Sequence, residues 1–134
     1  MKQFIIAYFT SLISILIIDG IWLFFVAKNF YAKYLGSLMA KSPNLLAAGI
    51  FYLLYPLGLI VLVILPAIKG NTSFFKIFLL GALFGLIAYA TYDLTNLATI
   101  KDWPVIVSVV DILWGTLYTG VISIIVVYLT RIFS

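Results

Sequence analysis

Four long apolar runs, separated by short polar segments, make up most of the chain. They cover roughly residues 4–27, 45–68, 74–100 and 104–130. About 20 apolar residues in a helix suffice to cross the hydrocarbon core of a bilayer, and each run is longer than that. The pattern therefore predicts an all-α membrane protein with four transmembrane helices. Because the connections at residues 69–73 and 101–103 are short, we expect an up-down bundle.

The longest connection, residues 28–44, reads KNFYAKYLGSLMAKSPN and has a helical pattern of its own. Its aromatic and leucine residues recur at helical spacing, while lysine and serine residues share another face. This pattern predicts a short interfacial helix between the first and second spans, lying in the headgroup region. We interpret the segment mainly as an aromatic and lysine anchor, with Trp22 and Trp103 as further anchors near the same interface. Its lysines are also candidates for a lipid-headgroup site, namely Lys28, Lys33 and Lys41.

The composition narrows the chemistry that the chain can perform. Of its 134 residues, 66% are hydrophobic and 9% are charged, and the mean hydropathy is +1.27. We therefore expect residues 1–134 to form a single four-span transmembrane domain. Cysteine and histidine are absent, which excludes disulfides, thiolate or imidazole metal ligands and a histidine-based catalytic triad. We accordingly expect no metal site and no cofactor.

The charges of the chain lie mainly in the connections and at the two ends. The net charge of +4 does not indicate nucleic acid as a partner, because the cations form no basic stripe. Attraction to anionic headgroups explains the charge more simply, so membrane lipids are the expected partners. We call side A the face with both termini and residues 69–73, and side B the face with residues 28–44 and 101–103. Each side carries four lysine or arginine residues, so the positive-inside rule leaves the orientation open.

Three of the four acidic residues, Asp19, Asp93 and Asp111, lie inside apolar runs. An aspartate at the centre of a spanning helix costs about 2.5–3.5 kcal/mol, so these side chains are expected to avoid lipid and to face the bundle interior. At about 1.5 Å per residue, the three aspartates and Tyr52 lie about 12–14 Å below side B. Four different helices thus contribute a polar side chain to one level of the membrane.

Further polar and aromatic residues lie near this level. On the third span, Tyr89, Asp93 and Asn96 share one helical face. Trp114 lies too deep for an interfacial indole, so we expect its N–H to have a partner in the bundle. The candidates for binding or for carrying protons are Asp19, Asp93, Asn96, Asp111, Tyr52, Tyr89 and Trp114. Three aspartates in a low dielectric cannot all be ionised, so either some of them hold protons, with coupled titrations, or a bound cation compensates.

Two other features concern the packing of the helices. Pro56 lies inside the second span, where its ring displaces the carbonyl of Tyr52, so we expect a kink and a new partner for the freed carbonyl. Small residues that would let two helices approach closely occur in the third and fourth spans. They are Gly81, Gly85, Gly115 and Gly120.

Three sequence motifs relate the chain to a known family. The runs DGIWLFFVAKNFYAKYLG, ATYDLTNLATIKDWP and VSVVDILWG resemble the bacterial family of small membrane proteins called domain of unknown function 2177. The similarity covers most of the chain. The resemblance implies a four-helix protein of the bacterial inner (cytoplasmic) membrane, with Asp19, Asp93, Asn96 and Asp111 inside the signature runs. It implies no particular activity or substrate.

Several functions are compatible with these residues. We favour a site that binds or translocates protons, a cation or a small cationic solute. Because one chain offers little room for a substrate path, a translocator is expected to be a homodimer or larger. The alternative is a membrane-embedded enzyme that modifies lipids with paired aspartates as acid and base.

Two further hypotheses are a peptidase and a structural protein. The Tyr92-Asp93 pair is shared with intramembrane aspartyl proteases, but their second G-x-G-D motif is missing, so a peptidase is disfavoured. In a structural or accessory subunit, the polar layer would only fix the packing of the helices. Whether the protein is an enzyme stays open at this point.

Overall fold

The computed structural model describes the whole chain, Met1–Ser134, and its regular structure is helical throughout. The α-helices are α1 (Lys2–Ile21), α2 (Lys28–Leu35), α3 (Leu45–Leu59), α4 (Leu65–Lys69), α5 (Phe74–Thr99) and α6 (Val105–Phe133). Two π-helical segments, Trp22–Val26 and Ile60–Ile64, extend α1 and join α3 to α4. The chain thus has four continuous helices that are long and apolar enough to cross a membrane: Lys2–Val26, Leu45–Lys69, Phe74–Thr99 and Val105–Phe133. The predicted four-span fold is confirmed.

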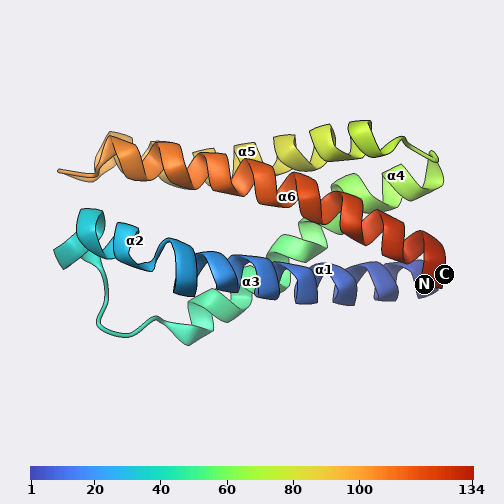
Figure 1. The fold of residues 1–134 in the computed structure, drawn as a ribbon, viewed down its shortest axis with the longest axis horizontal. Coiled ribbons are helices and arrows are strands. Elements are labelled where there is room, and N and C mark those ends of the chain that lie inside the picture. The colour runs from blue at the N-terminus through green and yellow to red at the C-terminus, as the bar shows by residue number, and fades with distance from the viewer.

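The four spans run alternately in opposite directions (Figure 1). Both termini and the turn between α4 and α5 lie at one end of the bundle, which is side A. At the other end, side B, lie α2 and the turn between α5 and α6. Helix α6 packs against α5 along most of its length and also against α1, while α3 packs against α1. Helix α6 therefore contacts both α1 and α5.

The short helix predicted between the first two spans is α2, which one turn of 3₁₀-helix follows at Gly36–Leu38. Gly36 has a φ of +42°, in the positive range that glycine adopts without a Cβ clash. The π-helical segment Trp22–Val26 leads almost directly into α2. As a result α2 stays against the side B end of the bundle (Figure 1).

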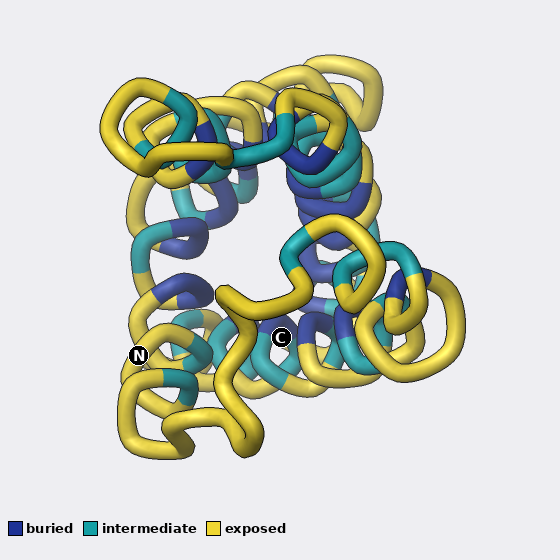
Figure 2. The backbone as a smooth tube through the Cα atoms, turned by 90° about the vertical axis from the view of Figure 1, so that its left-hand side faces the viewer, coloured by how far each residue is buried: buried dark blue, intermediate teal, exposed yellow.

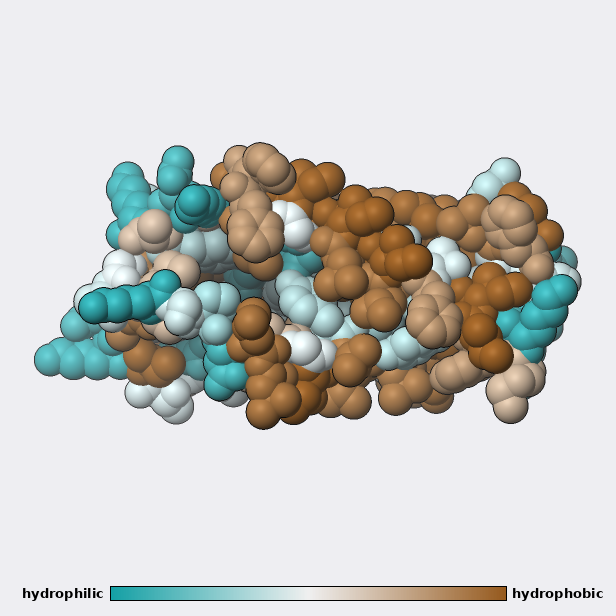
Figure 3. All heavy atoms as spheres, turned by 90° about the horizontal axis from the view of Figure 1, so that it is seen from below, coloured by the Kyte–Doolittle hydropathy of each residue, from teal (hydrophilic) through white to brown (hydrophobic).

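The outside of the bundle is apolar between two polar ends. Buried residues face the centre of the bundle and exposed residues its periphery (Figure 2). Figure 3 shows hydrophilic side chains at both ends and a broad apolar belt between them. On the face drawn there, paler and more polar side chains interrupt the belt in the half nearer side B. On this face, the surface between the two ends is thus more polar toward side B than toward side A.

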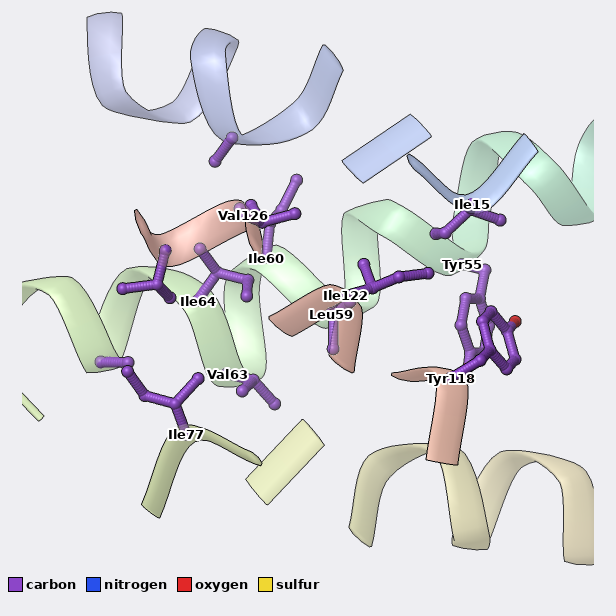
Figure 4. Close-up of a cluster of buried hydrophobic side chains, with 13 residues drawn as sticks. Ile15, Tyr55, Leu59, Ile60, Val63, Ile64, Ile77, Tyr118, Ile122 and Val126 are labelled. Carbon is purple, nitrogen blue, oxygen red and sulfur yellow. The ribbon is translucent and has the colours of Figure 1, made fainter. Parts of the chain in front are cut away.

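An apolar cluster fills the half of the interior nearer side A (Figure 4). Its fully buried members include Ile60 and Ile64 from the π-helical segment and Ile122 from α6. Tyr55 and Tyr118 lie together at one end of this cluster. Given the directions of the helices, the three aspartates of the spans lie nearer to side B than these two tyrosines do.

Close packing of α5 on α6 depends on the glycines that the sequence singled out. A Cβ on Gly81 would collide with Ser123, and one on Gly85 would collide with the carbonyl of Gly115 and with Thr119. Lipid tails are as apolar as leucine, so contact of this kind, rather than exclusion of water, holds spanning helices together. The predicted close approach of the two helices is confirmed.

The irregularity of the second span is not located at Pro56 itself. Helix α3 continues through Pro56 to Leu59, and the π-helical segment follows directly. The side-chain hydroxyl of Tyr8 on α1 donates a 2.9 Å hydrogen bond to the carbonyl of Leu53, three residues before the proline. The expected extra partner is therefore present, but it serves the carbonyl next to the predicted one at Tyr52. A proline ring disturbs the whole preceding turn, and Tyr8 can reach only the carbonyl that faces α1.

Candidate functional site

The three aspartates come from three different spans, and all of them are at least partly buried. Asp19 on α1 is 5% exposed, Asp93 on α5 is fully buried, and Asp111 on α6 is half-buried. No group of three acidic side chains lies close enough together to hold a metal ion. Asp93 and Asp111 are neighbours, whereas Asp19 is held separately by other partners. Asp93 and Asp111 thus form one pair, and Asp19 lies near enough to Asp111 for the two charges to interact.

Asp19 is fully supplied with hydrogen-bond donors. The Tyr52 hydroxyl donates to Oδ2 at 2.6 Å, and the Trp114 indole N–H donates to Oδ1 at 3.0 Å. These bonds connect α1 with α3 and α6, and they give Trp114 the partner that its depth predicted. Hydrogen bonds to a carboxylate are shorter and stronger than neutral ones. The two bonds therefore stabilise the packing of α1 against α3 and α6.

Asp111 accepts a hydrogen bond from the short helix α2. The Tyr31 hydroxyl on α2 donates to Asp111 Oδ1 at 2.7 Å, and the Trp22 indole N–H donates to the Tyr31 oxygen at 3.2 Å. The Trp22 ring stacks on the Trp114 ring with centroids 4.3 Å apart and planes 6° apart. Burial, followed by the negative charge of Asp111, raises the pKa of Tyr31 above its ordinary value. Tyr31 therefore remains a donor to Asp111 at neutral pH.

The interpretation of two tryptophans as lipid anchors is wrong in part. Trp22 packs on Trp114 and bonds Tyr31, so its indole belongs to the interior network. The Trp103 N–H donates to Ser108 Oγ at 3.0 Å, and that hydroxyl donates to the carbonyl of Asp93 at 3.1 Å. Position near an interface predicted an anchor, but the π-helical turn at Trp22 and the short turn before α6 direct both N–H groups inward.

Asp93 is the acidic side chain that the structure leaves without a hydrogen-bond partner, and the buried hydroxyls of Ser11 and Thr130 also have none. Its side chain is fully buried, and neither carboxyl oxygen accepts or donates a hydrogen bond. Asp111 is the acidic neighbour close enough for the two charges to interact. A buried polar group without a partner is rare and costly, and two like charges in a low dielectric repel strongly. Asp93 therefore lacks a positive or proton-donating counterpart, whereas Asp111 accepts the hydrogen bond from Tyr31.

A cavity of about 380 Å³ adjoins this pair. Its walls are Phe51 from α3, Ala88, Tyr89 and Tyr92 from α5, and Asp111 from α6. Drug-sized ligands occupy pockets of roughly 300–1,000 Å³ that are mainly apolar with a few polar groups. One carboxyl among three aromatic rings and an alanine matches that description. We call this space the lateral cavity.

A second, smaller cavity of about 180 Å³ lies beneath α2. It is lined by Tyr31, Leu35 and Met39 from the α2 region together with residues of α1, α5 and α6, among them Asp111. Asp111 and Tyr92 border both cavities. Asp111 is therefore the charged residue that the two cavities share.

The other candidates from the sequence are placed less centrally. Tyr89 lines the lateral cavity, but its hydroxyl is paired with that of Tyr118 at 2.9 Å. Asn96 is half-buried and makes no hydrogen bond to either member of the aspartate pair. The three lysines are exposed on the outside of side B and line neither cavity: Lys28, Lys33 and Lys41.

Sequence reasoning missed Tyr31 and Tyr92. Tyr31 is one of the aromatic residues of segment 28–44, which the sequence pattern indicates as an interfacial anchor, because a helical apolar stripe looks the same whether it contacts lipid or protein. The sequence does place Tyr31 and Leu35 one helical turn apart on the same face of the helix, and both residues line the cavity beneath α2. Tyr92 was noted only as the neighbour of Asp93 in a short motif.

Fold and site together define a multi-pass α-helical membrane protein with an acidic and aromatic site in the half of its interior nearer side B. The chain belongs to the family described as Predicted membrane protein (DUF2177), whose profile matches residues 4–128. That description agrees with the four spans and names no activity. No curated protein and no solved structure matches the chain significantly.

Proposed function

We propose that the protein binds a small organic cation between Asp111 and the aromatic rings of the lateral cavity. The observation that carries this proposal is the buried, unpartnered carboxyl of Asp93 beside Asp111. A cation in the adjoining cavity would supply the missing positive charge. The binding site would then be electrically complete only when it is occupied.

The walls of the cavity favour an organic cation over an inorganic one. Cations with alkyl groups bind over the faces of aromatic rings, and Phe51, Tyr89 and Tyr92 provide such rings next to a carboxyl group. Sodium, potassium, calcium and magnesium require a shell of several oxygen ligands. The cavity offers one carboxyl group and no set of three acidic side chains.

Binding is better supported than translocation by one chain. The apolar cluster closes the interior toward side A, while both cavities lie on the side B side of Tyr55 and Tyr118. A path across the membrane would need that cluster to open or a second copy of the chain to complete it. We extend the proposal accordingly to a homodimer for any transport role, in the bacterial inner membrane and in contact with its lipids.

A lipid-modifying enzyme is the second candidate. The adjacency of Asp93 and Asp111 at a cavity wall favours it, because two neighbouring carboxyl groups that share a proton can act as acid and base. The two candidates differ in what happens to the ligand. A binding protein returns the cation unchanged, whereas an enzyme yields a product that mass spectrometry detects.

Tetramethylammonium binding to the purified protein in a non-ionic detergent tests the proposal. Calorimetry at constant ionic strength, with sodium as the reference ion, should show saturable binding to the wild type. Asp111→Asn should weaken that binding at least about tenfold, which corresponds to about 1.4 kcal/mol. Asparagine retains the shape of the side chain and its hydrogen bond from Tyr31, so the fold should persist.

Asp102→Asn is the matched control. Asp102 is exposed in the turn before α6, and asparagine tolerates its left-handed backbone, with a φ of 63°. This variant should bind tetramethylammonium as the wild type does. Equal affinity of the wild type and Asp111→Asn, or no saturable binding to the wild type, would refute a cation site at Asp111.

A further inference from the structure

The lateral cavity opens toward the flank of the bundle, between α3 and α5. These two helices touch where the Phe84 ring meets Tyr55, with centroids 5.3 Å apart, and Gly58. One turn nearer side B, Phe51 on α3 and Ala88 on α5 both line the cavity, and α5 packs more extensively against the π-helical segment Ile60–Ile64 than against α3. The helices therefore separate toward side B directly beyond an aromatic contact.

The mouth of this cavity faces the membrane. Phe51 is 41% exposed and Tyr92 is 56% exposed, although both line the cavity. Both residues lie inside the spans Leu45–Lys69 and Phe74–Thr99. Side chains exposed there contact lipid chains in a bilayer. A ligand can consequently enter sideways from the hydrocarbon region.

The chemistry of the cavity changes from its mouth to its inner end. The exposed rings of Phe51 and Tyr92 form the mouth, and the one acidic residue of the lining is the half-buried Asp111, which neighbours Asp93. An apolar cavity that opens to lipid and contains one carboxyl group, with a second, unpartnered carboxyl next to it, is complementary to a molecule with an apolar chain and a positively charged head. A fully water-soluble cation would use only the inner end.

We propose that the natural ligand is a membrane amphiphile whose ammonium group binds Asp111 and whose alkyl chain passes between α3 and α5 into the bilayer. This inference rests on the proposed cation site and names the class of its ligand. The smaller cavity beneath α2 then gives the head group, but not the chain, a connection toward side B.

A series of alkyltrimethylammonium ions tests the inference. The dissociation constant is measured for tetramethylammonium and for chains of increasing length, each below its micelle concentration, in the same non-ionic detergent. Each methylene that enters the cavity should tighten binding to the wild type by about twofold to fourfold. Alkyl sulfates of equal length, which partition into micelles but lack the positive head, should not bind saturably.

Ala88→Trp should block the mouth, because Ala88 is the small residue of the α5 wall. In this variant, the gain in affinity per methylene should fall toward zero. Leu83→Trp is the matched control, since it adds an indole to an exposed position of the same helix outside the cavity. Ala88→Leu, a smaller obstruction, replaces Ala88→Trp if the larger variant unfolds, and its gain per methylene should be intermediate.

The outcomes separate this inference from the proposed function. If tetramethylammonium binds and depends on Asp111, but chain length adds nothing, the cation site stands and the amphiphile is refuted. An equal gain per methylene in the wild type and both Ala88 variants also refutes lateral entry. If Asp111→Asn binds tetramethylammonium as tightly as the wild type does, the proposed function itself is refuted.

Discussion

The Tyr31 hydroxyl donates a 2.7 Å hydrogen bond to Asp111 Oδ1 across 80 residues of sequence. This bond joins the interfacial helix α2 to the last span at the point where both cavities meet. The Trp22 indole N–H donates to the same hydroxyl, so the end of the first span is also joined to α2. Helix α2 is thus part of the site and also covers its side B end.

Tyr31→Phe should loosen α2 from the bundle. A hydrogen bond to a charged group contributes about 1.5–3 kcal/mol, so the variant should unfold at a lower temperature and α2 should be cleaved faster by added protease. Tyr34→Phe, on the same helix, is the control, because the Tyr34 hydroxyl makes no hydrogen bond in the structure and the side chain is 39% exposed. Equal unfolding temperatures and cleavage rates for the two variants would argue against the docking role.

Tyr31 should also make stability depend on pH in the alkaline range. Burial raises its pKa, and the charges of Asp111 and Asp93 raise it further above the ordinary value of 10.0. The folded protein therefore holds this proton more tightly than the unfolded chain does. The resulting stabilisation is fully present below about pH 10 and is lost as the pH rises through the higher pKa of the folded state.

The measurement for this prediction is the unfolding temperature as a function of pH. Between about pH 10 and 12, it should fall less steeply for Tyr31→Phe than for the wild type, because the variant has no proton to lose at this position. Parallel curves for the two proteins would contradict the prediction.

Removing either donor to Asp19 should destabilise the bundle. Tyr52→Phe leaves Oδ2 without its 2.6 Å donor, and Trp114→Phe removes the donor to Oδ1 together with half of the stack on Trp22. Each variant should lose about 1–3 kcal/mol of unfolding free energy in detergent. The two losses should not add, because both bonds hold the same carboxyl group. Tyr128→Phe, which alters an exposed tyrosine without a hydrogen bond, should leave stability unchanged.

Gly85→Ala should force α5 and α6 apart. The new methyl group would collide with the Gly115 carbonyl and with Thr119, and overpacking of this kind costs about 1–3 kcal/mol. Gly49→Ala is the control, because nothing lies within 4 Å of a Cβ at that position. There, alanine should be neutral or stabilising, since it favours helix over glycine. Circular dichroism during thermal unfolding compares the two variants, and similar curves would contradict the close-packing argument.

The helices and their topology could be predicted because hydrophobicity alone specifies them. Spans predicted at residues 45–68 and 74–100 occur as Leu45–Lys69 and Phe74–Thr99, and the short helix at α2 was also predicted. The glycine contacts of α5 and α6 followed from residue size. Trp114 was expected to have a partner, but its identity as Asp19 required the structure.

The pairing of the aspartates could not be predicted from depth. Sequence position gives the level of a residue along its helix, but the direction of its side chain depends on how the helix is rotated and on which helices are neighbours. The similar depths of Asp19, Asp93 and Asp111 below side B do not show which of the three carboxyl groups are neighbours. In the structure Asp93 and Asp111 form a pair, while Asp19 accepts hydrogen bonds from Tyr52 and Trp114.

The sequence by itself determined that this is a four-span membrane protein whose few acidic groups lie among apolar residues, because lipid selects long apolar helices and makes every buried charge costly. Only the tertiary structure decided that Tyr31 reaches Asp111, that Asp93 has no partner, and that a cavity opens between α3 and α5. These features depend on how helices far apart in sequence rotate and separate. Side-chain contacts across the bundle control that geometry, and no local pattern along the chain records it.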